Sequence, residues 1–257
     1  TVCAIVSLLA APAWACVDSL ATSVASVRPD AEPGAMDADQ AELLLHEAFQ
    51  LTRENFYDPK LNGVDWERVY TDALPRARKA KTRLELGSII NGALDQLHAS
   101  HTRYYTPEER EYFELLDIFN PEGVQQGMHP KIEAGPVRYI GIGAATRMIG
   151  DRVFVADVYD GGPAAKAGLH VGDEIVDVEG KPFRDIAPFR GRLGIPTILH
   201  VRKKTGGALH DLPVTPAPIQ PHQSFLRAEQ LSATLEERGG EKIAYVRVRS
   251  YAHQEFQ

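Results

Sequence analysis

The chain of 257 residues is poor in cysteine, and its two cysteines, Cys3 and Cys16, both lie close to the N-terminus. A fold held by a disulfide framework is therefore excluded for almost the whole chain. Lysine and arginine form no block, and the formal net charge is -7, which argues against nucleic acid or an anionic membrane as a partner. Beyond the N-terminal segment, no apolar run approaches the roughly 18 residues that a membrane-spanning helix needs.

The first residues, "TVCAIVSLLAAPAWACVDS", carry no charge before Asp18. An apolar run followed by the small-residue pattern "AWA" predicts a secretory signal peptide over residues 1–15. A buried N-terminal helix is the alternative. Cleavage after Ala15 makes Cys16 the first mature residue, a position that resembles the lipid acceptor of bacterial lipoproteins. We expect an exported protein, periplasmic or secreted, with lipidation at Cys16 as an open alternative.

At roughly 100–200 residues per domain, the length predicts about two domains. Residues 16–38 are rich in Ala, Ser, Asp and Pro without periodicity, and are predicted to be a linker. Apolar residues then recur every three or four positions in three segments, with Asp39 and Asp65 as predicted N-caps. Pro75 is expected to kink or divide the second helix. The pattern predicts a helical domain over 39–118.

Residues 119–135 contain proline and glycine without a period and are predicted to be a second linker. Short strands and glycine turns follow over residues 136–217. Pro163 stands where a short helix would begin and Gly168 where it would end. This texture predicts a small β domain.

Glycines at 141 and 143, in "YIGIGAA", permit backbone N–H groups to converge on an anion. Beside an open strand edge, such a nest suits the C-terminal carboxylate of an extended peptide. The glycine pair alone is equally typical of a bulge or of close packing.

The stretches "GIGA" (141–144), "GGPAAKAGLHVGDEIVDVEGKPF" (161–183) and "PTILHVRK" (196–203) together resemble a PDZ domain in the arrangement found in exported bacterial proteases. The resemblance implies that the backbone of Gly141, Ile142, Gly143 and Ala144 binds a peptide carboxylate. The second helix of such a domain would fall in "FRDIAPFRGRLG", whose proline and glycines predict a short helix and a specialised groove.

The helical segment, with "ENFYDPKLNGVDWERVYTDALPRA" (54–77) and "LDQLHASHTRYYTPEE" (94–109), resembles the N-terminal region of the C-terminal processing, or tail-specific, peptidases. Residues 218–257 resemble the start of that family's α/β core. The fold class is therefore expected to be α+β and multidomain: a helical domain, a PDZ-like β domain and the beginning of a peptidase core.

The resemblance implies an exported serine-type endopeptidase whose PDZ domain binds the C-termini of substrate proteins. The nucleophile of the family is a serine activated by a lysine. No serine here lies in a G-x-S-x-G motif, and none has a matching lysine element after it. We therefore expect the catalytic pair beyond Gln257 and no activity from this chain alone. The alternative is a non-catalytic periplasmic PDZ scaffold or adaptor.

His101, in "ASHTRYY", matches a position that supplies a catalytic histidine in the tricorn-like branch of the family. The alternative is a histidine that, with Thr102, stabilises the end of the third helix. His98 shares its helical face, but no further ligand completes a zinc set. We expect no metal and no cofactor, and the oligomeric state stays open.

The last segment alternates from Ile243 to Arg249 in the period-two pattern of a strand. No partner strand and no turn are evident in the sequence around it. It is predicted to be the first, unpaired strand of the peptidase core.

Overall fold

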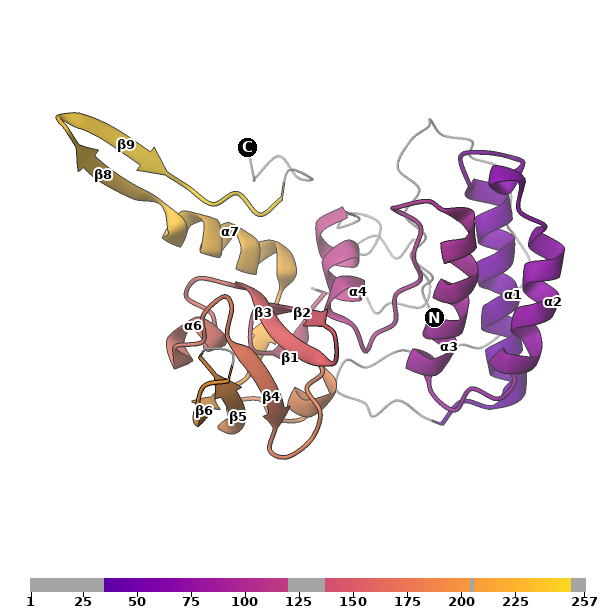
Figure 1. The fold of residues 1–257 in the computed structure, drawn as a ribbon, viewed down its shortest axis with the longest axis horizontal. Coiled ribbons are helices and arrows are strands. Elements are labelled where there is room, and N and C mark those ends of the chain that lie inside the picture. The colour runs from indigo at the N-terminus through magenta and orange to yellow at the C-terminus, as the bar shows by residue number, and fades with distance from the viewer. Residues whose placement is uncertain (1–34, 120–136, 204–205, 251–257) are drawn as a thin grey trace. The chain divides into compact units, whose positions relative to one another are not determined.

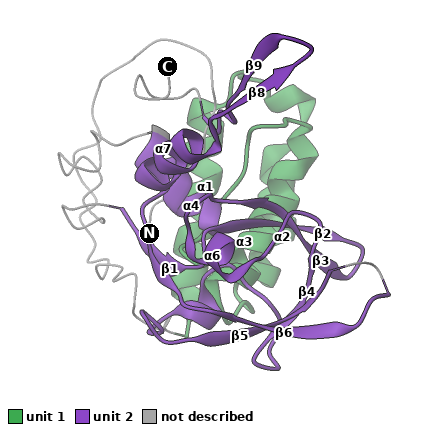
Figure 2. Cartoon of the chain, turned by 90° about the vertical axis from the view of Figure 1, so that its left-hand side faces the viewer, with its two compact units in different colours: residues 1–27, 32–108, 129–133 green, residues 28–31, 109–128, 134–257 purple. Residues whose placement is uncertain are grey.

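The computed structural model describes residues 35–119, 137–203 and 206–250 (Figure 1). These residues form two compact units, a helical unit of residues 35–108 and a sheet unit of residues 109–119, 137–203 and 206–250 (Figure 2). The predicted signal peptide and Cys16 lie outside the described residues, as does nearly all of the predicted linker 119–135. Within the described part of the chain, no helix has the length and apolar character needed to cross a membrane.

The helical unit contains the three predicted helices, α1 (Ala38–Asn55), α2 (Trp66–Ala77) and α3 (Arg83–Leu94), with short 3-10 turns at Leu61–Gly63 and Asp95–Leu97. The predicted cap at Asp39 is wrong. The side chain of Asp37 accepts from the backbone N–H of Gln40 at 2.8 Å, and Asp39 lies in the first turn. The two aspartates are two residues apart, and the spacing of apolar residues did not determine which of them begins the helix.

The predicted cap at Asp65 is confirmed, since its carboxylate accepts from the Arg68 N–H at 3.1 Å. Pro75 does not divide α2, which runs without interruption to Ala77. Because Pro75 lies in the last turn, it removes one hydrogen bond near the end of the helix and leaves the rest intact.

The core of the helical unit lies where the three helices face one another. Phe49 of α1 stacks on Trp66 of α2 with ring centroids 4.2 Å apart, and the Trp66 Nε1–H donates to the Phe49 carbonyl at 3.1 Å. From α3 and the turn after it, four apolar side chains are fully buried: Leu86, Ile90, Leu94 and Leu97. The indole is therefore held by both its apolar face and its polar edge.

The sheet unit is built on an antiparallel sheet in the order β2-β3-β4-β5-β6. Its strands are β2 (Ala144–Ile149), β3 (Arg152–Val158), β4 (Glu174–Val178), β5 (Thr197–Arg202) and β6 (Leu209–Val214). A separate antiparallel pair joins β1 (Tyr139–Gly141) to β7 (Ala217–Ile219). β2 lies at one edge of the larger sheet.

The short helix α6 (Pro163–Ala167) confirms the predicted helical turn, with Pro163 as its first residue and Gly168 as its C-cap at φ 82°. The segment predicted to hold a short second helix contains only the 3-10 turn Ala187–Phe189. Phe189 is fully buried in the sheet core and contacts Phe183 edge to face at 6.2 Å. The buried Phe189 side chain therefore holds this segment against the sheet, where a longer helix would otherwise pack.

Residues 109–119 pack in the sheet unit as α4 (Arg110–Glu114) and a π-helical turn, Leu115–Phe119. Phe113 of α4 contacts the Tyr139 ring of β1 at 5.3 Å. Asp117 accepts from the backbone N–H of His222, at the start of α7 (Pro221–Ser232), at 2.8 Å. α4 is thereby fixed against both β1 and α7.

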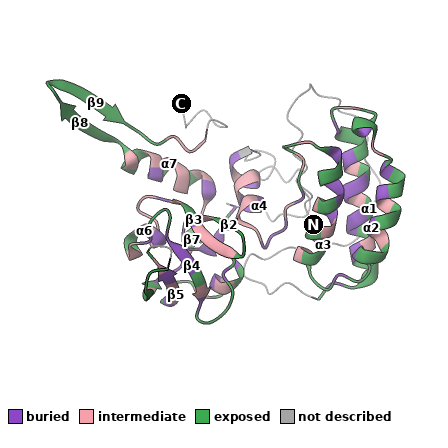
Figure 3. Cartoon of the chain, viewed as in Figure 1, coloured by how far each residue is buried: buried purple, intermediate pink, exposed green. Residues whose placement is uncertain are grey.

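The prediction of an unpaired closing strand is wrong. β9 (Glu241–Tyr245) pairs antiparallel with β8 (Thr234–Arg238) through a turn at Gly239 and Gly240, which have φ of 64° and 85°. β8 was missed because "TLEER" is charged and does not alternate. Both strands are exposed along their full length (Figure 3).

Candidate functional site

The loop predicted to bind a carboxylate, Gly141–Ala144, joins β1 to β2 and is held from one side by its carbonyl groups. The Ile142 carbonyl accepts from the N–H of Ala164 at 2.8 Å, and the Gly143 carbonyl accepts from the N–H of Tyr159 at 2.9 Å. The N–H groups of Ile142 and Gly143 have no acceptor among the described residues. The loop therefore contains two backbone donors without a described acceptor, on residues that are themselves buried, and such a pair of donors has the chemistry to bind an anion.

Glycine is required at both positions for different reasons. A Cβ on Gly141 would lie 2.6 Å from the ring of Tyr139, so the side chain that precedes the loop leaves no room for one. Gly143 has φ of 69°, a conformation that L-residues other than glycine rarely adopt, while a Cβ there would meet its neighbours at ordinary contact distances. The turn of the loop thus depends on backbone freedom at Gly143.

The strand that leaves the loop, β2, has an open edge. Its partner β3 pairs with one side, and no described strand pairs with the other. The register shifts between Ala145 and Thr146, and the far end of β2 is exposed, with Met148 60% exposed. An extended peptide can form antiparallel hydrogen bonds with such an edge.

A polar cluster, defined here as Arg110, Glu111, Glu114, Tyr159 and Asp185, lies beside the loop. Arg110 donates to the Tyr159 hydroxyl at 3.3 Å and forms ion pairs with Glu114 and, at 2.6 Å, with Glu111. The Tyr159 hydroxyl donates to Glu114 Oε1 at 2.6 Å. The cluster connects α4 to the residue whose backbone N–H holds the Gly143 carbonyl.

Burial has distinct effects on two members of the cluster. Desolvation raises the pKa of Asp185 to about 6, against the opposing attraction of Arg110 and a weak hydrogen bond of 3.4 Å from Thr146 Oγ1. Desolvation also raises the pKa of the Tyr159 hydroxyl well above its ordinary value, and the nearby Glu114 carboxylate adds to this. Tyr159 therefore stays protonated and donates at neutral pH, while Asp185 titrates close to neutrality.

His101 lies in the helical unit, in an exposed segment after the turn Asp95–Leu97. Its Nδ1 is 2.8 Å from the hydroxyl of the adjacent Ser100. His98 forms the C-cap of that turn in the left-handed conformation, with φ of 51°. Among the described residues, no group of histidine, cysteine and carboxylate side chains is arranged to hold a metal ion.

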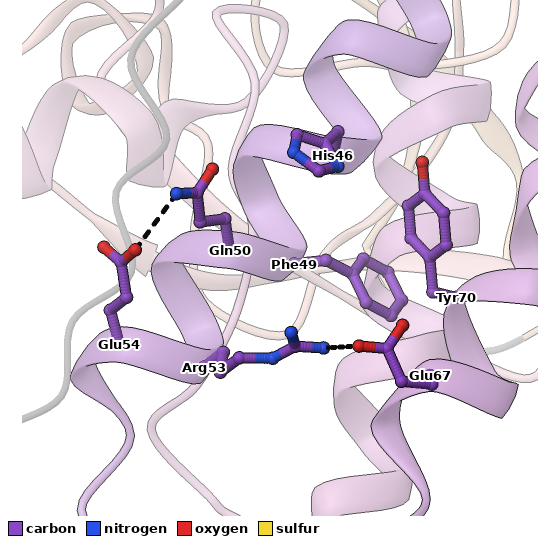
Figure 4. A pocket seen from close by; sticks show the side chains of 7 residues that line it. All are labelled: His46, Phe49, Gln50, Arg53, Glu54, Glu67 and Tyr70. Carbon is purple, nitrogen blue, oxygen red and sulfur yellow. Dashed lines mark hydrogen bonds and ion pairs between the residues drawn. The ribbon is translucent and has the colours of Figure 1, made fainter.

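The helical unit has one further hollow feature that the sequence did not indicate, a pocket of about 320 Å³ between α1 and α2. Figure 4 shows the ion pair of Arg53 with Glu67 across it and the hydrogen bond from Gln50 to Glu54 at 3.0 Å. Its lining residues are His46, Phe49, Gln50, Arg53, Glu54, Glu67 and Tyr70. Both carboxylates already have partners within the pocket: the Arg53–Glu67 pair joins α1 to α2, and the Gln50–Glu54 bond lies within α1.

The sequence predicts the loop as a binding site, and it gives no indication of the cluster beside it. Tyr159 could have been found, because it ends the predicted strand "RVFVADVY" and precedes the glycine pair of the PDZ-like stretch. Arg110 carries no comparable signal, since it meets Tyr159 across 49 positions of the chain. Asp185 lies in the segment "FRDIAPFRGRLG", where the sequence predicts a short second helix and gives no sign of a buried carboxylate.

Comparison with known proteins identifies two families along the chain. Residues 38–95 match the tricorn protease C1 domain, and residues 154–193 match the PDZ domain. The first match falls in the helical unit and the second in the sheet unit. Both families are therefore represented, in the order that the sequence resemblance implied.

Two curated relatives span both units. The chain is 24% identical over 178 residues to carboxyl-terminal-processing peptidase 3, chloroplastic, of Arabidopsis thaliana, covering 67% of this chain and 31% of that protein. It is 24% identical over 223 residues to a carboxyl-terminal-processing protease of Picosynechococcus, covering 83% of this chain and 47% of the relative. This chain thus spans between 31% and 47% of the length of these relatives.

Among solved structures, the chain matches the photosystem II D1 C-terminal processing protease. It is 19% identical to this chain, with a TM-score of 0.40, and the match covers 70% of this chain and 44% of the other.

Proposed function

This chain belongs to the carboxyl-terminal-processing peptidase family that carries a PDZ domain, and on that premise we propose that it binds the C-terminal ends of substrate proteins for a serine-type endopeptidase. One observation carries the binding half of the proposal. Two backbone N–H groups, on Ile142 and Gly143, stand without an acceptor in the described chain where the loop enters the open-edged strand β2.

The chemistry of that arrangement selects a free peptide C-terminus. The residues before the terminus pair with the edge of β2 in an extended conformation, and the terminal carboxylate accepts from the two loop N–H groups. A charged acceptor forms stronger hydrogen bonds with backbone N–H groups than a neutral one does. An amidated terminus has the same backbone but no charge, so it binds more weakly.

The catalytic half of the proposal rests on the family. A serine nucleophile with a lysine base is implied by the resemblance, and no serine or lysine of this chain matches those elements. We therefore propose that this chain supplies substrate recognition and does not hydrolyse peptides by itself. Export through the N-terminal segment, to the periplasm or the exterior, is part of the same proposal.

Matched free-acid and amidated peptides, titrated calorimetrically into the whole chain, test the binding proposal. We expect the free acid to bind about tenfold more tightly, a difference of about 1.4 kcal/mol. Equal affinity of the two peptides would overturn the proposal.

Two glycine variants locate the binding to the loop. Gly143→Ala strains the loop by roughly 1–2 kcal/mol, because it forces a side chain into the left-handed region. Gly150→Ala is the matched control, since Gly150 has a similar φ of 64° and open space around it at the β2–β3 turn. Free-acid binding should weaken in Gly143→Ala and persist in Gly150→Ala. Equal weakening in both variants would place the binding elsewhere.

A further inference from the structure

We propose that the pocket between α1 and α2 is a binding site for an organic ammonium group, carried by a small molecule or by a lysine side chain of another protein. The pocket lies in the helical unit, whereas the proposed peptide site lies in the sheet unit. The inference therefore goes beyond the proposed function and does not depend on it.

The first argument is the aromatic wall of the pocket (Figure 4). The rings of Phe49 and Tyr70 meet at 73° with centroids 5.2 Å apart, and the ring of His46 meets Tyr70 at 78° and 6.0 Å. Trp66, which does not line the pocket, stacks on Phe49 and holds that ring in place. The face of an aromatic ring attracts cations, and rings at steep angles to one another form a corner in which a cation contacts more than one of them.

The second argument is the charge of the lining residues. The pocket is lined by two carboxylates and one guanidinium, so with His46 neutral these side chains leave a net negative charge. This charge already acts on the aromatic wall. The pKa of Tyr70 is raised, first by desolvation and then by the carboxylates of Glu42 and Glu67, against the opposing charge of Arg78. A cation in the pocket is attracted by the same carboxylates, whereas an anion is repelled.

The third argument is that the two carboxylates keep the capacity to bind a further cation. Glu67 accepts from Arg53 through Oε1, and Glu54 accepts from Gln50 through Oε1. The Oε2 atom of each has no hydrogen-bond partner among the described residues. The side chains of Arg53 and Glu67 are 54% and 72% exposed, so solvent weakens this ion pair. An ammonium group can therefore share Glu67 with Arg53, or replace Arg53 there, at little cost.

The size of the pocket limits the ligand. Its volume of about 320 Å³ lies at the lower end of the range found for small-molecule sites. Such a volume suits a single small group, such as a trimethylammonium group or the end of a lysine side chain, and not an extended chain.

Choline and its uncharged isostere 3,3-dimethylbutan-1-ol test the proposal, because the two molecules share a shape and differ in charge. The fluorescence of Trp66 reports binding in the whole chain, with Trp14→Phe removing the only other tryptophan. We expect choline to bind about tenfold more tightly than the isostere. Equal affinity of the two molecules, or no binding of choline at millimolar concentration, would overturn the inference.

Two substitutions that break the same ion pair separate binding from structure. Glu67→Gln removes an attracting carboxylate and should weaken choline binding about fivefold, the effect of one unit charge about 4 Å away in water. Arg53→Gln removes the competing cation and should strengthen choline binding by a similar factor. Because both variants lose the Arg53–Glu67 pair, a purely structural role predicts shifts in the same direction, and that result would overturn the inference.

Asp72→Asn is the matched control. Asp72 lies on α2 like Glu67, is 73% exposed where Glu67 is 72% exposed, and does not line the pocket. The substitution should leave choline affinity unchanged. A loss equal to that of Glu67→Gln would show that choline responds to the overall charge of the unit and not to this pocket, and the inference would be wrong.

A second probe identifies the source of the ammonium group. It is a blocked tripeptide of glycine, lysine and glycine, compared with the same tripeptide containing norleucine in place of lysine. Tighter binding of the lysine peptide than of choline assigns the pocket to a protein side chain, and the reverse order assigns it to a small ammonium compound. Either order supports the inference, and binding of neither cation overturns it while leaving the proposed function of the sheet unit untouched.

Discussion

Asp185 should make the sheet unit less stable at neutral pH than at mildly acidic pH. Its pKa is raised from 3.8 to about 6 in the folded state, mainly because its carboxyl group is desolvated. A group that binds its proton more tightly when folded destabilises the fold above the folded pKa, and this cost disappears as the pH falls below the unfolded pKa. The relevant window therefore runs from about pH 7 down to about pH 4.

The magnitude follows from the rise in pKa. A rise from 3.8 to about 6 corresponds to roughly 3 kcal/mol at pH 7.5, and this net rise already includes the opposing charge of Arg110. Asp185→Asn removes the titration and keeps a side chain of similar size. We expect the variant to be more stable than the unmodified chain by about 1–3 kcal/mol at pH 7.5 and to lose this advantage at pH 4.

Urea unfolding followed by circular dichroism, at both pH values, measures the difference. Asp151→Asn, at the exposed β2–β3 turn, is the control for removing a carboxylate from the same unit. The gain in the free energy of unfolding from Asp185→Asn must depend on pH more strongly than the change caused by Asp151→Asn does. An effect of the same size at pH 7.5 and pH 4 would refute the reasoning.

Three further predictions concern stability and the catalytic assignment. Phe189→Ala should lower the free energy of unfolding by about 3–5 kcal/mol. Leu193→Ala, in the same segment but at a side chain that is 56% exposed, should lower it by under about 0.5 kcal/mol. Urea unfolding compares the two variants, and equal losses would contradict the anchoring role of Phe189. Asp37→Ala should cost about 1 kcal/mol, more than Asp39→Ala, because only Asp37 caps α1; thermal unfolding would show the reverse order if the cap were at Asp39. His101→Ala should leave peptide binding unchanged, and neither it nor the unmodified chain should cleave a fluorogenic peptide; turnover that His101→Ala abolishes would assign that residue to catalysis.

Local signals allowed much of the fold to be predicted from the sequence. Pro163 begins α6 and Gly168 ends it, because each residue favours the backbone conformation that its own position requires. Asp65 caps α2 for a similarly local reason, since its side chain accepts from a backbone N–H three residues later. The glycine loop at 141–144 was found because the surrounding strands and turns form a recognisable pattern. These features depend on a few neighbouring residues, which a sequence displays directly.

The sequence was less informative where contacts join distant segments. The hairpin partner of β9 was missed because β8 is charged and exposed, so no apolar alternation marks it. The pairing of Arg110 with Tyr159 brings together residues from separate stretches of the chain, and neither shows a pattern that predicts the other. The raised pKa of Asp185 likewise depends on burial that only the assembled unit creates.

The packing of α4 determines where the sheet unit can be separated from the rest of the chain. The matched PDZ segment covers residues 154–193, whereas Tyr139 and Tyr159 find partners in α4. A transplant of residues 137–250 into another protein would leave the Tyr139 ring without Phe113 and the Tyr159 hydroxyl without Glu114. The portable unit of this protein therefore has to include residues 109–119, and its natural boundary lies before α4.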